Sequence, residues 1–68
     1  MLNPSRTRIL RLKSVVDIIS LSRSTVYRLI NDGVFPKPFK LGASSIGWDS
    51  ADIDQWIAER KLATYTIH

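Results

Sequence analysis

The residues best suited to binding chemistry lie in one short stretch, LSRSTVYRLINDG at 21–33. Its hydroxyl, guanidinium and amide groups are those that hydrogen-bond to phosphate oxygens and to the edges of nucleic-acid bases. Successive helical residues turn by about 100°, which divides this stretch into two faces. The apolar face consists of Val26, Leu29 and Ile30. The polar face consists of Ser24, Arg28 and Asn31. We therefore predict a helix that buries one face and offers the other to a nucleic acid, with an ordinary solvated surface helix as the alternative.

Both ends of this helix are marked in the sequence. Ser22 stands where an N-cap belongs, because its side-chain oxygen can accept a hydrogen bond from an amide of the first turn. Gly33 suits the other end, since a residue without a Cβ takes the left-handed conformation without strain. Arg23 in the first turn opposes the helix dipole, at a cost of roughly a few tenths of a kcal/mol that a bound phosphate would remove.

Length and charge narrow the class of partner. The chain has 68 residues and a formal net charge of +4. This length predicts a single domain with a thin core. Residues 1–40 hold eight lysines and arginines against two aspartates, whereas residues 41–68 hold two basic residues against four acidic ones. A surface that binds a polyanion therefore belongs to the first two thirds of the chain.

The remaining composition argues against catalysis. Cysteine is absent and the single histidine is the terminal His68, so neither a zinc site nor a histidine-based catalytic triad has its residues. No glycine-rich phosphate loop occurs, and the six carboxylates are scattered along the chain. We expect no enzymatic activity, no metal and no cofactor.

Hydropathy gives the expected location. No apolar run approaches the roughly 20 residues that span a bilayer, and the start, MLNPSRTR, lacks the apolar core of a secretory signal. The absence of cysteine fits a reducing compartment. We expect a cytoplasmic protein with no membrane partner.

The residues before the central helix are predicted to form an arm, a strand and the first helix of a helix-turn-helix. Residues 1–7 are polar and aperiodic, which predicts a disordered arm. Residues 8–12, RILRL, alternate basic and apolar side chains as a short edge strand does. Residues 13–20 have a wide apolar arc that predicts a helix of about two turns. A tight turn to the helix at 22–32 then gives a helix-turn-helix, whose second helix is offered to the DNA major groove. A plain helical hairpin is the alternative.

A small hairpin follows the central helix. Two prolines within residues 34–38 exclude a helix there. Residues 39–41, 42–45 and 46–48 read as strand, turn and strand. Beside a helix-turn-helix such a hairpin is a wing, which contacts the DNA backbone or the minor groove, and we place this contact within residues 37–46. The polar candidates for it are Lys37, Lys40, Ser44 and Ser45.

A third helix closes the domain. Asp49 or Ser50 can cap a helix over residues 51–62, whose outer face is mostly acidic. Its apolar face consists of Ile53, Trp56 and Ile57. The large aromatics that we assign to the core are Phe39 and Trp48. Residues 63–68 are expected to form a flexible tail. The predicted fold, over residues 8–62, is mainly α with a small β-hairpin: a winged helix-turn-helix with three helices and two or three strands.

The order of these segments resembles the AlpA-like family of small phage and prophage regulators. The resemblance is carried by LSRSTVYRLINDG at 21–33, FPKPFKLG at 35–42, GW at 47–48 and IDQWIAER at 53–60. It covers most of the chain from Arg8 to Lys61. It implies a winged helix-turn-helix of the excisionase and MerR-like type, with the second helix in the major groove and the wing on the backbone. It further implies DNA contact by Arg23, Ser24, Thr25, Tyr27 and Arg28.

The family resemblance implies double-stranded DNA as partner and leaves two tasks open. Members regulate transcription of phage or prophage genes, or act with an integrase as recombination directionality factors that bend attachment-site DNA. A third interpretation is a protein-interaction module that docks on a regulator or an integrase. A monomer this small covers few base pairs, so further copies of the chain on repeated sites are expected as partners.

The wing departs from the family pattern. Relatives commonly carry an arginine between the wing glycine and the GW pair, where this chain has ASSI at 43–46. A serine hydrogen-bonds to a phosphate oxygen but brings no charge that would release a counterion. We therefore expect Lys37 and Lys40 to supply the wing's electrostatic attraction.

Overall fold

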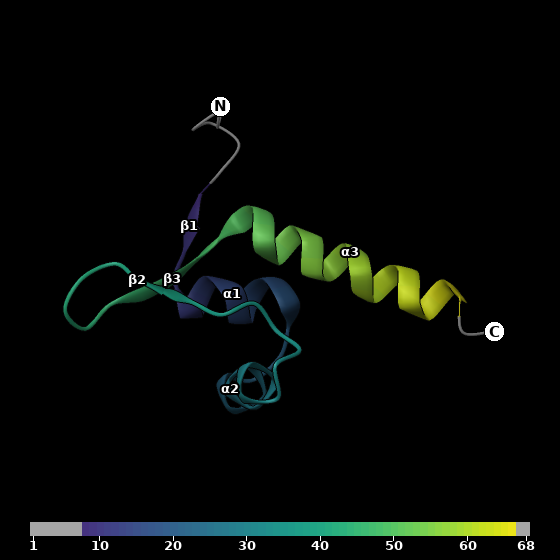
Figure 1. The fold of residues 1–68 in the computed structure, drawn as a ribbon, viewed down its shortest axis with the longest axis horizontal. Coiled ribbons are helices and arrows are strands. Elements are labelled where there is room, and N and C mark those ends of the chain that lie inside the picture. Colours follow the sequence, from purple (N-terminus) through teal and green to yellow (C-terminus); the bar gives the residue numbers. More distant parts are fainter. Residues whose placement is uncertain (1–7, 67–68) are drawn as a thin grey trace.

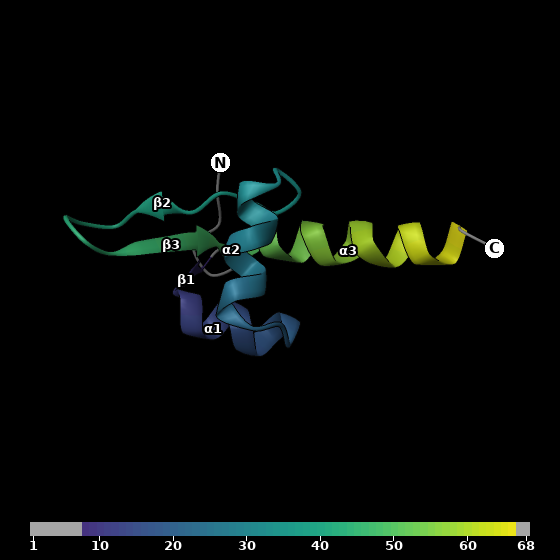
Figure 2. The same cartoon turned by 90° about the horizontal axis from the view of Figure 1, so that it is seen from below.

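A computed structural model describes residues 8–66 of the chain. In chain order its elements are β1 (Ile9–Leu10), α1 (Leu12–Ile19), α2 (Arg23–Asn31), β2 (Phe39–Lys40), β3 (Ile46–Asp49) and α3 (Ser50–Thr66). The strands form one antiparallel sheet in the order β1-β3-β2. The wing, formed by β2, β3 and the turn between them, and the far end of α3 project in opposite directions (Figures 1 and 2). The winged helix-turn-helix that the sequence predicts is therefore the observed fold.

A tight turn connects α1 to α2. Ser20 ends α1 in the left-handed conformation, with φ of 59°, and its amide donates to the carbonyl of Val16 at 2.8 Å. A left-handed residue reverses the chain direction within one position. The chain therefore reaches the N-cap of α2 only two residues later, and α2 crosses beside α1 (Figure 2).

The short strand β1 is held by pairing with β3 and by hydrogen bonds to the first residue of α3. Leu10 pairs with Trp48 and Ile9 with Asp49, which places β1 at an edge of the sheet as predicted. The amide of Arg8 donates to Ser50 Oγ at 2.8 Å, and the amide of Ser50 donates to the carbonyl of Arg8 at 2.7 Å. These reciprocal bonds join the start of the described chain to the start of α3.

The register of the wing decides which side chains are buried. Phe39 pairs with Gly47, and Lys40 pairs with Ile46. Paired residues of antiparallel strands share a face, and successive residues alternate between faces. Phe39 therefore lies on the outer face and is 44% exposed. Our assignment of Phe39 to the core was wrong, because its register opposite Gly47 turns it away from the helices.

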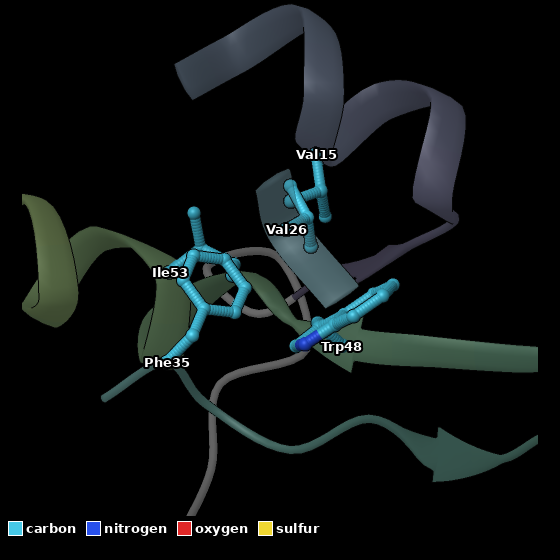
Figure 3. Packing of buried hydrophobic residues seen from close by; sticks show 5 residues of the cluster. All are labelled: Val15, Val26, Phe35, Trp48 and Ile53. Atoms are coloured by element: carbon cyan, nitrogen blue, oxygen red, sulfur yellow. The ribbon is translucent and has the colours of Figure 1, made fainter. Parts of the chain in front are cut away.

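The core is formed by five buried side chains from five segments of the chain, which Figure 3 shows gathered in one cluster. They are Val15, Val26, Phe35, Trp48 and Ile53. Trp48 was correctly assigned to the core. Phe35 takes the place expected for Phe39, with its ring edge-on to Trp48 and Trp56 at centroid distances of 6.4 and 4.8 Å.

Two indole N–H groups fix the segment that joins α2 to the wing. Trp48 Nε1 donates to the carbonyl of Pro36 at 2.7 Å, and Trp56 Nε1 donates to the carbonyl of Val34 at 2.8 Å. Phe35, between these two acceptors, is buried. The wing is thereby held in a defined position relative to α2.

The third helix is longer than expected. Of the two cap residues that the sequence offered, Asp49 is the one that caps the helix, since its Oδ1 accepts from the amide of Ala51 at 2.9 Å. Its apolar face packs on the core as predicted, but α3 runs to Thr66 instead of ending near Leu62. Glycine and proline are absent from residues 51–68, so no stop signal occurs there. Residues 63–66 of the expected tail are helical, and the predicted arm at 1–7 lies outside the described residues.

Gly47 is a point where the sheet leaves little room for a side chain. A Cβ built there would lie 3.0 Å from Ile9 Cγ2, 3.0 Å from Leu41 Cδ1 and 3.1 Å from the backbone oxygen of Leu10. The backbone oxygen cannot yield without disturbing the pairing of β1. We expect Gly47→Ala to lower the free energy of unfolding by about 1–3 kcal/mol, measured by urea denaturation.

Gly42 supplies the matched control for this substitution. A Cβ at Gly42 would meet nothing within 4 Å. Gly42→Ala should therefore change stability by no more than about 0.5 kcal/mol. Equal stability of the two variants would show that the close contacts at Gly47 do not constrain the sheet.

Candidate nucleic-acid interface

The start of α2 is capped as the sequence predicts. Ser22 Oγ accepts from the amide of Thr25 at 3.2 Å. The same oxygen lies 2.8 Å from Thr25 Oγ1 and 3.3 Å from Ser24 Oγ. The hydroxyl of Thr25 is thus engaged within the protein, whereas Ser24 is exposed. At the other end Gly33 takes φ of +77°, and its amide donates to the carbonyl of Ile30 at 3.0 Å.

The two faces of α2 are separated as expected. Val26 is buried, and Leu29 and Ile30 pack against the core. The exposed residues of α2 are Arg23, Ser24, Tyr27, Arg28 and Asn31. Tyr27 is 50% exposed, although burial of an aromatic side chain is favourable. The outward face of α2 is therefore composed of cations, hydroxyls and an amide.

A hollow of about 310 Å³ lies where α1, α2 and the wing meet. Its lining comprises Arg11, Leu12, Lys13, Arg23, Tyr27, Ser44 and Ile46. Three predicted site residues are thus brought together: Arg23, Tyr27 and Ser44. Arg11 and Lys13 are near them although sequence reasoning did not name them as site residues. The basic excess of the first forty residues was the only signal for these two, and only the fold places them beside α2.

The other predicted site residues lie around this hollow or apart from it. Arg28 and Asn31 are exposed on α2 but do not line it. Lys40 is paired with Ile46, so it lies on the sheet face that lines the hollow. Ser45 closes the wing turn, because its carbonyl accepts from the amide of Leu41 at 2.7 Å. Lys37 is exposed in the connection between α2 and β2 and does not line the hollow.

The charged side chains that line this hollow are all cations. The N-cap of α1 is Arg11, which makes no side-chain hydrogen bond to the first turn, and neither α1 nor α2 has an acidic residue in its first turn. The unpaired amides of a helix start carry partial positive charge, which adds to that of the side chains. Asp17 of α1 and Asp32 at the C-cap of α2 do not line the hollow, and the other acidic side chains of the described residues lie at the end of β3 and on α3. The region suits a polyanion such as a phosphate backbone.

Residues 8–66 contain no cluster of three or more histidine, cysteine, aspartate or glutamate side chains that could hold a metal ion. In the same part of the chain no helix is long and apolar enough to cross a membrane.

Comparison with known proteins identifies the family. Residues 8–61 match the protein family described as prophage CP4-57 regulatory protein (AlpA). The chain belongs to the AlpA family. The resemblance seen in the sequence is therefore confirmed, and the AlpA match spans α1, α2, the wing and most of α3.

Two relatives extend this AlpA match. The chain is 41% identical over 64 residues to the DNA-binding transcriptional activator AlpA of Escherichia coli (strain K12), covering 85% of this chain and 91% of that protein. It is 38% identical over 56 residues to the uncharacterized protein ORF88 of Enterobacteria phage P4, covering 82% of this chain and 64% of that protein.

Proposed function

We propose that this AlpA-family chain is a sequence-specific, double-stranded-DNA-binding regulator of phage or prophage genes that works in the cytoplasm. The observation that carries the proposal is the exposed polar face of α2 beside a hollow with cations and no carboxylate in its lining. The name of the relative in Escherichia coli, a DNA-binding transcriptional activator, supports it. The chain acts by binding alone, without catalysis.

In this proposal α2 enters the major groove, which at about 12 Å wide admits one helix. Arg28 and Asn31 on its exposed face suit base edges, because arginine pairs with guanine and asparagine with adenine through two hydrogen bonds. Arg23 and Ser24 at the helix start suit phosphate oxygens. Exposed Tyr27 adds contact area beside them.

The wing contacts the backbone in the same proposal. Ser44 reaches the hollow beside α2, and Lys40 shares the sheet face that lines it. A serine positions a phosphate by hydrogen bonding, and a lysine adds charge. The two indole hydrogen bonds fix the connection between α2 and the wing, so helix and wing approach one strand in a fixed arrangement.

Lys40 is expected to displace about one counterion from the DNA when the chain binds. Lys40→Ala should weaken binding to all DNA sequences alike and make the slope of log K against log salt shallower by about one unit. Filter binding or fluorescence anisotropy at several salt concentrations measures this slope. Lys61→Ala, which removes an exposed cation from α3, is the control and should leave the slope unchanged. An unchanged slope for Lys40→Ala would remove Lys40 from the DNA surface.

The proposal as a whole is tested with a labelled duplex of unrelated sequence at three salt concentrations. Non-specific binding rests on phosphate contacts, so affinity should fall steeply as salt rises. Such a fall would justify selection of the specific site from random duplexes. Absence of binding even at low salt would contradict a DNA-binding function.

A recombination directionality factor is an alternative task for the same surface. Both tasks require a helix that reads the groove, and they differ in DNA bending and in an integrase partner. Further copies of the chain on repeated sites fit either task, since one small domain covers few base pairs. A circular-permutation bending assay separates the two, because only the directionality factor must bend its site strongly.

One observation favours protein docking as a second candidate function. A groove of about 350 Å³ runs between α1 and α3. Its lining comprises Ile18, Ile19, Trp56, Ile57, Arg60, Lys61 and Thr64. Ile18 is 50% exposed there. A contact at this groove with a regulator or integrase would be far less sensitive to salt than DNA binding and would survive a change at Arg28.

A further inference from the structure

We propose that the hollow between α1, α2 and the wing binds one phosphodiester group of the DNA backbone, held jointly by Arg11, Lys13 and Arg23. This inference rests on the proposed DNA-binding function. It adds Lys13 of α1 and Arg11, the N-cap of that helix, to the interface, and it assigns all three cations to a single phosphate.

The lining of the hollow matches the chemistry of a phosphodiester. Three of its seven residues are cations, two more carry hydroxyls, and none is a carboxylate. Cations that surround one space repel each other until an anion enters it. A phosphate accepts hydrogen bonds from guanidinium, ammonium and hydroxyl groups alike, and such charge-assisted bonds are the strong ones. The lining is therefore complementary to such an anion in charge and in hydrogen-bonding groups.

The position of the hollow matches the path of a DNA strand. Arg23 and Tyr27 come from the helix proposed to enter the major groove, and Ser44 comes from the turn of the wing. A strand that borders the groove occupied by α2 must pass between helix and wing. One phosphate held there touches α1, α2 and the wing together and fixes their register on the strand.

The proposed site also accounts for the missing charge of the wing. The wing turn reads ASSI at 43–46, without a cation. Arg11 and Lys13 approach the same space from the start of α1. The charge that the wing lacks is therefore supplied from the other side of the hollow.

The hollow is a single space that its three cations share. Its volume of about 310 Å³ holds a phosphodiester and a few water molecules, each of about 30 Å³. The three cations should therefore release the counterions of one phosphate, about 0.9 per phosphate for duplex DNA, and not of three.

The test compares the salt dependence of non-specific duplex binding for the wild-type chain, Arg11→Ala/Lys13→Ala, the triple variant with Arg23→Ala added, and Lys61→Ala. All four side chains are exposed, and circular dichroism checks that each variant is folded. The triple variant should lose about 0.9 from the slope and bind about tenfold more weakly at 0.1 M salt, whereas the double variant, in which Arg23 still pairs with the phosphate, should lose less. Lys61→Ala should match wild type. A variant that exchanges the two cations, Arg11→Lys with Lys13→Arg, keeps both charges and should show the wild-type slope.

Each other outcome points to a different failure. Steep salt dependence in the wild-type chain with an unchanged slope in the triple variant overturns the phosphate site and leaves the DNA-binding function standing. A slope that falls by about 2.7 in the triple variant shows three separate phosphate contacts and overturns the shared site. No binding by the wild-type chain at low salt overturns both.

Discussion

Replacing Trp48 by alanine is expected to remove a large part of the stability of the domain. Trp48 is 1% exposed, packs edge-on with Phe35, and donates from Nε1 to the carbonyl of Pro36 at 2.7 Å. Truncation of a buried tryptophan costs about 3–5 kcal/mol, and a domain of this length is stable by only roughly 3–10 kcal/mol. The carbonyl of Pro36 also loses its donor. Far-UV circular dichroism with urea denaturation measures the loss.

Phe39→Ala is the matched control in the same sheet. Phe39 is a large aromatic on β2, but it is 44% exposed on the outer face. Its truncation should lower stability by no more than about 1 kcal/mol. If the two variants unfolded at the same urea concentration, the faces that the register assigns to the sheet would be incorrect.

Arg28→Ala is expected to have the largest effect on DNA recognition. Arg28 is exposed in the last turn of α2, away from the core, so its removal should leave the fold intact. A bidentate arginine–guanine pair contributes about 1–3 kcal/mol of discrimination, so binding to the specific site should weaken roughly 5- to 150-fold. Binding to unrelated duplexes should weaken much less.

The measurement uses a specific site selected from random duplexes and single-base variants of it. The wild-type chain should discriminate at the position that Arg28 reads, and the variant should tolerate all bases there. Lys37→Ala, which removes an exposed cation outside the hollow, should leave base discrimination unchanged. An equal loss by Arg28→Ala on every sequence would make Arg28 a phosphate contact and leave specificity to other residues of α2.

Local signals in the sequence were sufficient to predict α2 and its neighbours. The hydroxyl of Ser22 and the missing Cβ of Gly33 act within one helical turn, so their effect does not depend on distant residues. The same holds for the cap at Asp49 and for the short connection after α1. The order of elements, and with it the fold, followed from these boundaries.

The burial of aromatics did not follow from local signals. Phe35 and Phe39 are four residues apart in the same proline-rich stretch, and composition favours neither for the core. The choice depends on the register between β2 and β3, which places Phe39 opposite Gly47. It also depends on the acceptors at Val34 and Pro36, which two distant tryptophans bind.

The composition of the hollow depended on tertiary structure as well. Arg11 and Lys13 precede α2 by about ten residues and read as ordinary charges of a first helix. The left-handed Ser20 folds α1 back beside α2, and the wing then closes the third side. A long-range arrangement of this kind cannot be obtained from periodicity.

The central claim is that the exposed face of α2 and the wing form the DNA surface, and amide chemical-shift mapping tests it most directly. An isotope-labelled chain is titrated with an unrelated duplex at low salt. We expect the shifts to concentrate at residues 23–28 and 37–45, with Arg11 and Lys13 included and the exposed face of α3 unmoved. Shifts confined to α3 and the groove beside α1 would contradict the account and identify a protein-docking domain.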